Sequence, residues 1–265
     1  MSAADLAPAE GLERAREILA GSARPLVLTG AGVSAESGVP TFRGPEGLWK
    51  RHRPEELATP EAFLRDPRLV WEWYAWRRGK VASCRPNAAH HAIARVVWDR
   101  PGARVVTQNV DGLHERAARD AADGELTARE RPLELHGSLF RVRCTRCALR
   151  APHTGAIDAT ERETLPRCSA CAGLLRPDVV WFGEALEPSV VQEAFRLAAG
   201  ADVCLVVGTS ALVHPAASLP LATLDGGGVV IEVNPEPTPL SSVAGVTLRG
   251  AAGLLLPLLL AEARR

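Results

Sequence analysis

The sequence predicts an α/β fold, namely a doubly wound parallel sheet with a smaller domain inserted into it. Short runs rich in Val, Leu and Ile recur along the chain and alternate with segments of helical spacing, such as 87–98 and 188–199. This alternation is typical of a parallel sheet covered by helices on both faces. The runs that we predict to be strands span residues 25–29, 104–107, 133–135, 203–207 and 229–233.

Two segments interrupt this alternation and predict the smaller domain. Residues 41–82 contain no strand-like run but hold Trp49, Trp71, Trp73 and Trp76, which indicates a helical module packed by aromatic side chains. Residues 140–176 hold two pairs of cysteines and little apolar material, so a metal is needed to stabilise them. We expect 1–40, 83–139 and 177–265 to form the sheet domain, and 41–82 and 140–176 to form the smaller one.

Length, charge and hydropathy exclude several classes of protein. With 265 residues, of which 46% are hydrophobic, the chain can bury a sizeable core, and its formal net charge of 0 gives no overall attraction to nucleic acid or to a membrane surface. The first 21 residues mix acidic and basic side chains, unlike a signal or transit peptide. The longest apolar run, 251–261, is too short to span a bilayer. We therefore expect a cytoplasmic monomer without membrane contact.

Two Cys-x-x-Cys pairs predict a zinc site. They are separated by twenty residues, a spacing found in four-thiolate zinc ribbons, and such pairs in a chain without export signals point to a metal and not to disulfides. Four thiolates complete the tetrahedron and leave no position for water, so the single zinc ion should be structural. The predicted ligands are Cys144, Cys147, Cys168 and Cys171.

A zinc ribbon can also be a nucleic-acid module. Residues 140–176 hold seven arginines against three acidic residues, but they lack the interleaved aromatic side chains on which bases stack. We therefore do not expect nucleic acid as a partner. Cys84 and Cys204 lie outside the pairs and are given no catalytic role; Cys204 lies in a predicted strand, where a free thiol is usually a buried apolar group.

A glycine-rich loop follows the first predicted strand. Residues 30–35 read G-x-G-x-x-A, which can bring backbone N–H groups onto a pyrophosphate, as in Rossmann-like folds. A dehydrogenase would need a second strand ending in an acidic residue about twenty residues later. Residues 47–56 contain no such strand, so hydride transfer is disfavoured. Polar residues also follow the other predicted strands, at 108–111, His136, 208–210 and Asn234, and should converge on one cleft.

These motifs together resemble the sirtuin family. The run GAGVSAESGVPTFRG at 30–44 is followed in order by TQNVDGLH at 107–114, by His136-Gly137, by the cysteine pairs, and by GTS at 208–210 and VNPE at 233–236. The resemblance extends from residue 25 to 257. It implies an NAD-dependent protein-lysine deacylase that uses NAD as co-substrate, carries one structural zinc ion and acts on acyl-lysine proteins.

The resemblance also assigns an NAD site. The backbone of 30–32 would cradle the phosphates, and His136 would be the general base acting on the ribose hydroxyls, a role that suits the pKa of an imidazole. Asn109 is the second implied catalytic residue. The implied NAD-binding residues are Gly30, Ala31, Gly32, Ala35, Thr41, Phe42, Arg43, Trp49, Gln108, Asn109, Val110, Asp111, Gly208, Thr209, Ser210, Asn234, Pro235, Glu236 and Ala252. For His90, His91 and His114 we expect capping or packing roles.

Two further segments resemble the parts of sirtuins that bind the substrate. The loop 176–184 would pair with the acyl-lysine peptide as a strand through Val180, Phe182, Gly183 and Glu184, although a plain buried strand is an alternative. The pair Tyr74 and Arg77 would share one face of a helix, and it resembles the pair found in sirtuins that remove succinyl and malonyl groups.

A guanidinium can hold a carboxylate with two parallel hydrogen bonds, so a pocket lined by this pair would favour acidic acyl groups. The alternative is that Arg77 is a solvated charge beside Arg78. At the level of function, two alternatives to a deacylase remain open. One is a protein mono-ADP-ribosyltransferase that uses the same NAD cleft, and the other is a module that binds NAD or nucleic acid without catalysis.

Overall fold

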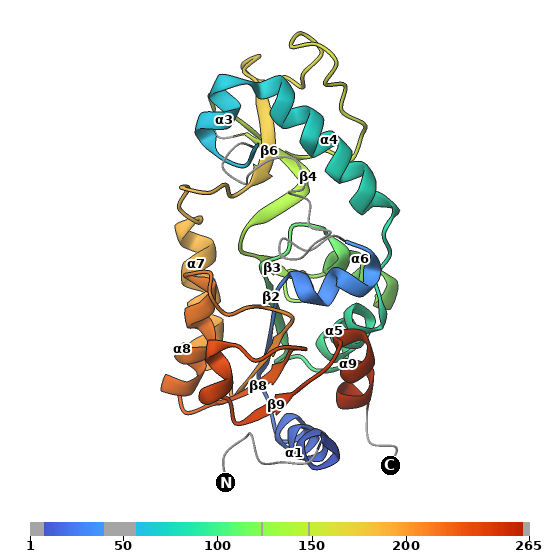
Figure 1. The fold of residues 1–265 in the computed structure, drawn as a ribbon, viewed down its shortest axis with the longest axis vertical. Coiled ribbons are helices and arrows are strands. Elements are labelled where there is room, and N and C mark those ends of the chain that lie inside the picture. The colour runs from blue at the N-terminus through green and yellow to red at the C-terminus, as the bar shows by residue number, and fades with distance from the viewer. Residues whose placement is uncertain (1–7, 40–56, 123, 148, 262–265) are drawn as a thin grey trace.

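The computed structural model describes residues 8–39, 57–122, 124–147 and 149–261. Its main element is a six-stranded parallel sheet with the order β3-β2-β1-β7-β8-β9 (Figure 1). These strands are β1 (Pro25–Thr29), β2 (Arg104–Thr107), β3 (Leu133–Glu134), β7 (Val203–Val207), β8 (Val229–Val233) and β9 (Val246–Leu248). The chain runs outward from β1 to β3 and then returns to the other side of β1. In such a sheet, ligands bind beyond the carboxyl ends of the strands where the order reverses, here between β1 and β7.

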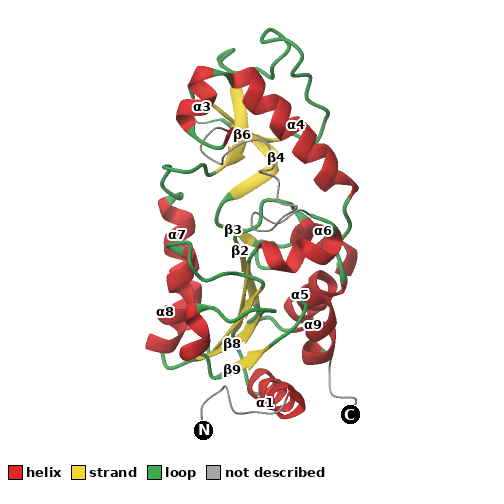
Figure 2. Ribbon diagram, in the orientation of Figure 1, coloured by secondary structure: helices red, strands yellow, loops and turns green. Residues whose placement is uncertain are grey.

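Helices cover both faces of this sheet (Figure 2). One face is covered by α1 (Pro8–Ala20), α5 (Ala88–Asp99) and α9 (Ala252–Leu260), with α6 (Leu113–Ala121) beside α5. The other face is covered by α7 (Pro188–Gly200) and α8 (Leu219–Asp225). Neighbouring residues of β1 point to opposite faces of the sheet: Val27 packs in the core under α1, α5 and α9, and Leu26 packs in the core under α7 and α8. The described residues of this part of the fold also form the short 3-10 helices η2 (Ala31–Ser37), η3 (Ala216–Ser218) and η4 (Pro239–Ser242).

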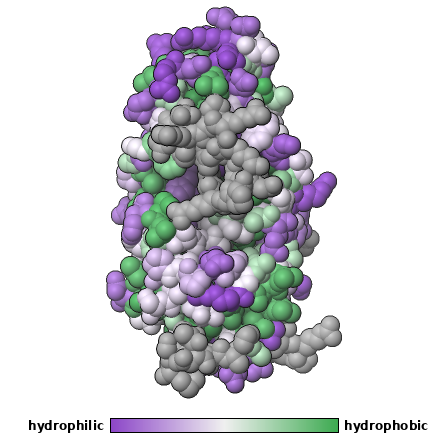
Figure 3. All heavy atoms as spheres, in the orientation of Figure 1, coloured by the Kyte–Doolittle hydropathy of each residue, from purple (hydrophilic) through white to green (hydrophobic). Residues whose placement is uncertain are grey.

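A smaller module lies beyond the carboxyl end of the parallel sheet (Figure 1). Its antiparallel sheet has the order β5-β4-β6, with β4 (Gly137–Cys144), β5 (Arg150–Pro152) and β6 (Leu175–Val179), and two helices pack on it, α3 (Pro60–Arg65) and α4 (Pro67–Ser83). Asp66 and Pro67 begin α4, since the Asp66 carboxylate accepts the N–H of Leu69 at 3.0 Å. Trp71 then joins α4 to β6 by donating its indole N–H to the carbonyl of Leu175 at 2.9 Å. On the face shown in Figure 3, hydrophilic side chains gather at this end of the molecule.

The predicted fold class is confirmed. Four predicted strands have the observed limits, and β3 is one residue shorter than predicted. The sequence prediction missed the edge strand β9, whose three residues include the polar Thr247 and so give too short an apolar run. The segment 140–176 also contributes more to a core than predicted, because Val142, Leu165 and Leu175 are buried in one cluster with Trp71. No helix in the part of the chain that the structure describes is long and apolar enough to cross a membrane.

Candidate active site

Glycines bring the loops after β1 and β7 into direct contact. The N–H of Gly30 donates to the carbonyl of Val207 at 3.0 Å, and that of Gly32 donates to the carbonyl of Gly208 at 2.8 Å. A Cβ on Gly32 would lie 2.7 Å from the Cα of Gly208. Gly208 itself has φ +60, and a Cβ there would lie 2.5 Å from the nitrogen of Val33. The carboxyl edge is therefore lined by backbone at this point, which fits a phosphate-binding loop.

The loop after β2 is joined to the same place by polar side chains. Gln108 donates from Nε2 to the hydroxyl of Thr209 at 3.0 Å, which links the loops after β2 and β7. Val110 is buried, and its carbonyl accepts the N–H of Leu139 in β4 at 2.9 Å. Ser210 lies half-buried next to Thr209. Residues from three strand ends thus meet at one edge of the sheet.

A buried polar cluster surrounds Ser34 in η2. Its hydroxyl donates to Asp111 Oδ2 at 2.8 Å and accepts from Asn109 Nδ2 at 3.1 Å. Asp111 Oδ1 accepts the N–H of Leu113, the first residue of α6, at 2.9 Å, so this carboxylate is also tied to the start of that helix. Sequence reasoning placed Asn109 and Asp111 here but missed Ser34, although Ser34 lies within the glycine-rich motif that it singled out.

Two neutral histidines lie behind this cluster. His90 Nε2 is 3.3 Å from the Ser34 hydroxyl, and its Nδ1 takes part in the cap of α5 with Asn87. The rings of His90 and His114 are 4.8 Å apart, and His114 Nε2 is 2.8 Å from Thr29 Oγ1. Burial lowers the pKa of His90 to about 3 and that of His114 to about 4. The structure thus gives His90 a capping contact and, in addition, a contact at the site, while His91 is exposed.

His136 lies between β3 and β4, where the parallel sheet leads into the smaller module. Its Nδ1 is 2.9 Å from the carbonyl oxygen of Gln108. A carbonyl can only accept, so Nδ1 holds the proton of the neutral ring and Nε2 is left as an acceptor. Burial lowers the pKa of His136 below its ordinary value, and the bond to Gln108 opposes that shift. The side chain is half-buried, and near neutral pH it is a base with a fixed tautomer.

The other predicted NAD residues lie along the same edge with fewer links to this centre. Asn234 follows β8, and its Nδ2 donates to the carbonyl of Glu236 at 2.8 Å. Ala35 is exposed in η2, and Ala252 is buried at the start of α9. Glu36 joins these two elements by accepting the N–H of Gly253 at 2.6 Å. Pro235 and Glu236 are exposed. The predicted residues Thr41, Phe42, Arg43 and Trp49 lie outside the described residues.

The segment 176–184 begins in the buried strand β6, and its predicted peptide-binding part, Val180 to Glu184, is a turn beyond that strand. The N–H of Val180 donates to the carbonyl of His136 at 2.9 Å, and that of Phe182 donates to the carbonyl of Ala58, also at 2.9 Å. The Phe182 side chain is 54% exposed, and Gly183 turns the chain with φ +80. The predicted peptide loop therefore lies directly beside the backbone of His136.

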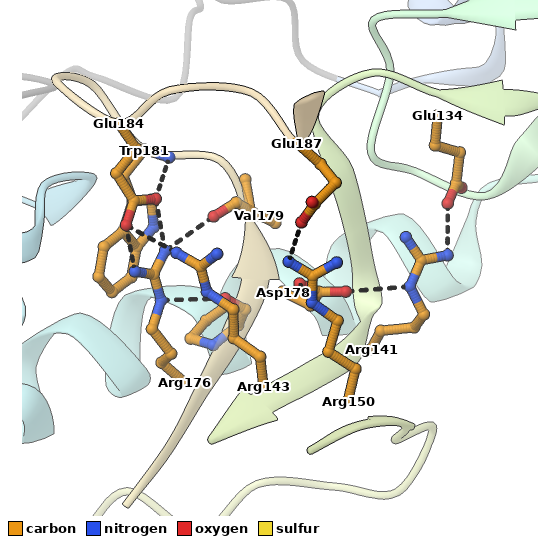
Figure 4. Close-up of polar contacts among 11 residues, drawn as sticks. Glu134, Arg141, Arg143, Arg150, Arg176, Asp178, Val179, Trp181, Glu184 and Glu187 are labelled. Atoms are coloured by element: carbon orange, nitrogen blue, oxygen red, sulfur yellow. Dashed lines mark hydrogen bonds and ion pairs between the residues drawn. The ribbon is translucent and has the colours of Figure 1, made fainter. Parts of the chain in front are cut away.

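Glu184 ends this turn and holds it by ion pairs (Figure 4). Its Oε1 accepts from Arg143 and from Arg176 at 2.6 Å each, and its Oε2 accepts from Arg176 at 2.9 Å. Burial opposes ionisation of Glu184, but the bonds from Arg176 and from the N–H of Trp181 outweigh it and lower the pKa of Glu184. The Glu184 carboxylate is thus bound within the protein.

Tyr74 and Arg77 are both buried on one face of α4, with 1% and 5% of their surface exposed. The Tyr74 hydroxyl accepts the indole N–H of Trp181 at 2.8 Å, and the Arg77 guanidinium lies 5.3 Å from the ring centre of Trp73. Burial lowers the pKa of Arg77, whereas Tyr74 and Asp111 act in the opposite direction. The alternative that Arg77 is a solvated helix charge is therefore wrong. The pair is buried near the carboxylate of Asp111.

Four cysteine sulfurs lie together at the far end of the smaller module. They are those of Cys144, Cys147, Cys168 and Cys171, all within 4.8 Å of one another. The pairs Cys144–Cys171 and Cys147–Cys168 are separated by 3.4 and 3.6 Å. Zn–S bonds of about 2.3 Å place the sulfurs of a tetrahedron about 3.8 Å apart, so the cluster fits one zinc ion with four thiolates. The two other cysteines, Cys84 and the buried Cys204, lie outside the cluster.

A second row of ion pairs joins the smaller module to the parallel sheet (Figure 4). Arg141 in β4 contacts Glu134 in β3 at 2.5 Å and Asp178 in β6 at 3.2 Å. Arg150 contacts Asp178 at 3.6 Å and Glu187, the residue before α7, at 3.0 Å. Burial raises the pKa of Glu134 to about 7, although the Arg141 guanidinium acts against this shift. Several arginines of the zinc-binding segment are thus paired with carboxylates, which removes most of the local excess of positive charge.

Comparison with known proteins agrees with this geometry. A model of the Sir2 family matches residues 30–215. An NAD-dependent protein deacylase from Pyrococcus furiosus is 49% identical over 251 residues, which are 94% of this chain and 96% of that protein. The chain belongs to the Sir2 family. The resemblance to sirtuins found in the sequence motifs is therefore confirmed.

Solved Sir2 structures share the fold along nearly the whole chain. A Sir2 homologue in complex with NAD is 49% identical, with a TM-score of 0.83, and the match covers 94% of this chain and 92% of that chain. A Sir2 protein with a p53 peptide and NAD⁺ is 30% identical, with a TM-score of 0.78, and the match covers 92% of this chain and 95% of that chain. At this likeness, the fold is that of the Sir2 family.

Proposed function

We propose that this Sir2-family protein removes acyl groups from protein lysine side chains with consumption of NAD, and that it prefers acyl groups that end in a carboxylate. The observation that carries the proposal is His136, held as a neutral base by the Gln108 carbonyl beside Asn109 and Asp111. The deacylase activity is that of relatives nearly half identical over 94% of the chain. The carboxylate preference rests on Tyr74 and Arg77 alone.

NAD would lie along the carboxyl edge of the parallel sheet. The backbone at Ala31 and Gly32 would face the phosphates, because the glycine contacts there leave no room for side chains. Thr209 would add a hydroxyl at the phosphates, and Ser210 and Asn234 would supply a hydroxyl and an amide group for the adenosine ribose. NAD supplies a ribose C1′ whose bond to nicotinamide breaks readily, since the positively charged pyridine ring is a good leaving group.

His136 would take the proton from a ribose hydroxyl. Because its Nδ1–H is engaged by Gln108, Nε2 is the atom that receives this proton, and the Gln108 carbonyl then stabilises the resulting imidazolium. Asn109 and Asp111 are buried and fixed by Ser34, so they would orient the nicotinamide half and exclude water. The acyl carbonyl oxygen would attack the ribose C1′ as nicotinamide leaves, and the deprotonated 2′-hydroxyl would then attack the acyl carbon. With one water consumed, the products would be free lysine, nicotinamide and an O-acyl-ADP-ribose.

The peptide would pair with the backbone from Val180 to Glu184. The bonds of Val180 to His136 and of Phe182 to Ala58 hold this backbone in place, and the ion pairs of Glu184 fix its far end. Because these bonds engage the N–H groups of Val180 and Phe182, the peptide would pair mainly with carbonyl groups of this segment. Binding through backbone groups gives affinity with little sequence selectivity. An acyl-lysine inserted from this loop would pass His136 and end near Tyr74 and Arg77.

The activity is tested with NAD and one lysine peptide that carries, in turn, acetyl, malonyl and succinyl groups. Mass spectrometry should show loss of the acyl group and formation of O-acyl-ADP-ribose. Transfer of ADP-ribose to protein without loss of acyl would instead support the mono-ADP-ribosyltransferase alternative.

The acyl preference is tested by Arg77→Met. Loss of a charge-assisted pair in a closed site should lower kcat/KM for the succinyl peptide, by an amount that corresponds to roughly 2–4 kcal/mol of activation free energy. The kcat/KM for the acetyl peptide should change little. Arg68→Met is the matched control, because Arg68 is on the same helix but lies near the surface, where it pairs with Glu72. Equal losses on both peptides would leave an ordinary deacetylase. The cytoplasmic location and the monomeric state stay predictions.

A further inference from the structure

Trp181 donates a hydrogen bond to the hydroxyl of Tyr74, and this fixes the role of that hydroxyl. The Trp181 Nε1 and Tyr74 Oη atoms are 2.8 Å apart, and the two residues are 3% and 1% exposed. An indole N–H can only donate, so the phenol oxygen must accept. Its own proton then points away from Trp181, toward whatever else lies beside the ring.

We propose that Trp181 is a positioning residue that holds the Tyr74 hydroxyl as a hydrogen-bond donor toward the carboxylate of an acidic acyl group. This inference rests on the acyl preference proposed above and names the residue that sets it. Within the described residues, the bond from Trp181 is the only hydrogen bond of this hydroxyl. A buried hydroxyl usually has partners for both of its functions, so its proton calls for an acceptor that the substrate can bring.

The position of Arg77 identifies that acceptor as an anion. Arg77 lies three residues after Tyr74 on α4 and is also buried, so a group that meets both side chains meets one O–H and one guanidinium. A carboxylate accepts from both, whereas the methyl end of an acetyl group accepts from neither. Burial raises the pKa of Tyr74, which keeps the phenol protonated and able to donate.

The indole of Trp181 is held rigidly enough to act in this way. The guanidinium carbon of Arg176 lies 3.3 Å from its ring centre, and Arg176 is itself fixed by two bonds to Glu184 and one to the carbonyl of Val179. A cation over the ring withdraws electron density and makes the N–H a better donor. The ring centre of Phe63 lies 5.4 Å away and completes the packing.

The loop from Val180 to Glu184 would therefore contact the peptide backbone of the substrate and also position a group that binds the acyl carboxylate. Its backbone would bind the peptide, while the Trp181 side chain reaches Tyr74 and would set its hydroxyl where the acyl carboxylate is proposed to bind. An ordered peptide loop and an ordered acyl pocket are then one unit, tied together by the Arg176–Glu184 ion pair.

The test is Trp181→Phe, which keeps an aromatic ring and removes the N–H. The ratio of kcat/KM for a succinyl-lysine peptide to that for the acetyl-lysine peptide of the same sequence should fall about tenfold, the size expected for one hydrogen bond to a charged group. In a Tyr74→Phe background, the same substitution should leave the ratio unchanged. Binding of the two peptides without NAD, measured by calorimetry, should show the same selective loss for the succinyl peptide.

Each result bears on the proposal. A loss that is equal for the two peptides, or that persists in the Tyr74→Phe background, overturns it, because Trp181 then only supports the loop. If Trp181→Phe fails to fold, replacing Trp181 by 3-benzothienylalanine keeps the ring shape without the N–H, and the same ratio decides. A wild-type protein without succinyl preference contradicts the proposed acyl preference, whereas a preference that Trp181→Phe leaves intact contradicts the role of Trp181 alone.

Discussion

The nucleotide end of the parallel sheet and the smaller module are stabilised by different interactions. At the nucleotide end, glycine backbones touch, and hydroxyls, amides and neutral histidines surround the carboxylate of Asp111. In the smaller module, a cluster of thiolates and two rows of arginine–carboxylate pairs accompany one aromatic core. The first region depends on close fit, and the second depends on charge and on a metal ion.

This difference predicts how each region should fail. A close-packed backbone contact is sensitive to one added carbon atom and insensitive to salt or chelators. Thiolates and ion pairs respond to chelation, to ionic strength and to pH. His136 stands where β3 leads into β4, so its function requires both regions to be in place.

The largest effect should come from His136→Ala, which removes the base at this junction. We expect kcat to fall by about 10² to 10⁴, with NAD affinity nearly unchanged, because the imidazole acts on a ribose hydroxyl during the reaction. The rate of the wild-type protein should fall as pH drops through the pKa of His136, which lies below its ordinary value of 6.5. Steady-state rates and NAD titration measure both quantities. His91→Ala, at an exposed position of α5, is the control, and a parallel loss of NAD affinity in His136→Ala would indicate a structural role.

Cys168→Ser should break the smaller module and spare the parallel sheet. With three thiolates left, zinc should be released and the smaller module should unfold at a temperature lower by on the order of 10 °C, with loss of deacylation. Metal analysis and calorimetry would measure zinc content and the unfolding temperature. Cys84→Ser, which changes a half-buried thiol outside the cluster, should keep the zinc. Full activity and an unchanged melting profile in zinc-free protein would contradict the prediction.

Gly32→Ala should act on the other region. Its Cβ would lie 2.7 Å from the backbone of Gly208, so the loops after β1 and β7 must separate, at a cost of about 1–3 kcal/mol in the free energy of unfolding. NAD binding should be lost while zinc is retained, as measured by denaturant titration and metal analysis. Gly79→Ala is the matched control: this helical position in α4 has open space, and Ala should stabilise it by up to about 1 kcal/mol. A stability of Gly32→Ala equal to wild type would mean that the loops can move apart freely.

Sequence reasoning located the features that are local in the chain. The β-rich runs gave the strands, and the spacing of the cysteine pairs gave four residues that the fold brings together. The helical spacing of Tyr74 and Arg77 gave a pair that shares one buried face. In each case the physical cause acts over a few residues, so the pattern is visible in the sequence.

Contacts between distant segments could not be found in this way. The approach of His90 to Ser34 joins residues 56 positions apart, and the bond from Trp181 to Tyr74 joins residues 107 positions apart. The bond from Arg143 to Glu184 joins residues 41 positions apart. These contacts follow from the packing of the module on α4, which no periodicity in the sequence encodes.

The neutral histidines should make the nucleotide end sensitive to acid. The pKa of His114 is about 4 in the folded protein against 6.5 for an ordinary histidine, so the unfolded chain binds a proton first. Stability should therefore be complete above pH 6.5 and fall by on the order of 3 kcal/mol as pH decreases toward 4. His114→Gln, which can keep a bond to Thr29, should flatten this dependence in urea titrations from pH 4 to 7. An unchanged slope would show that other groups govern acid unfolding.

Glu134→Gln should have the smallest effect and the opposite pH sign. Burial raises the pKa of Glu134 to about 7, so its folded form binds the proton more tightly than the unfolded chain, and its contribution to stability is lost as pH rises from 4.5 through 7. At pH 8, the substitution removes both a buried charge and its ion pair with Arg141, and these losses should nearly cancel, within about 1 kcal/mol. Urea titrations from pH 4.5 to 8 would measure the change. A loss of several kcal/mol at pH 8 would mean that the Glu134–Arg141 pair holds the smaller module to the parallel sheet. The parallel sheet would then also depend on an ion pair, at β3.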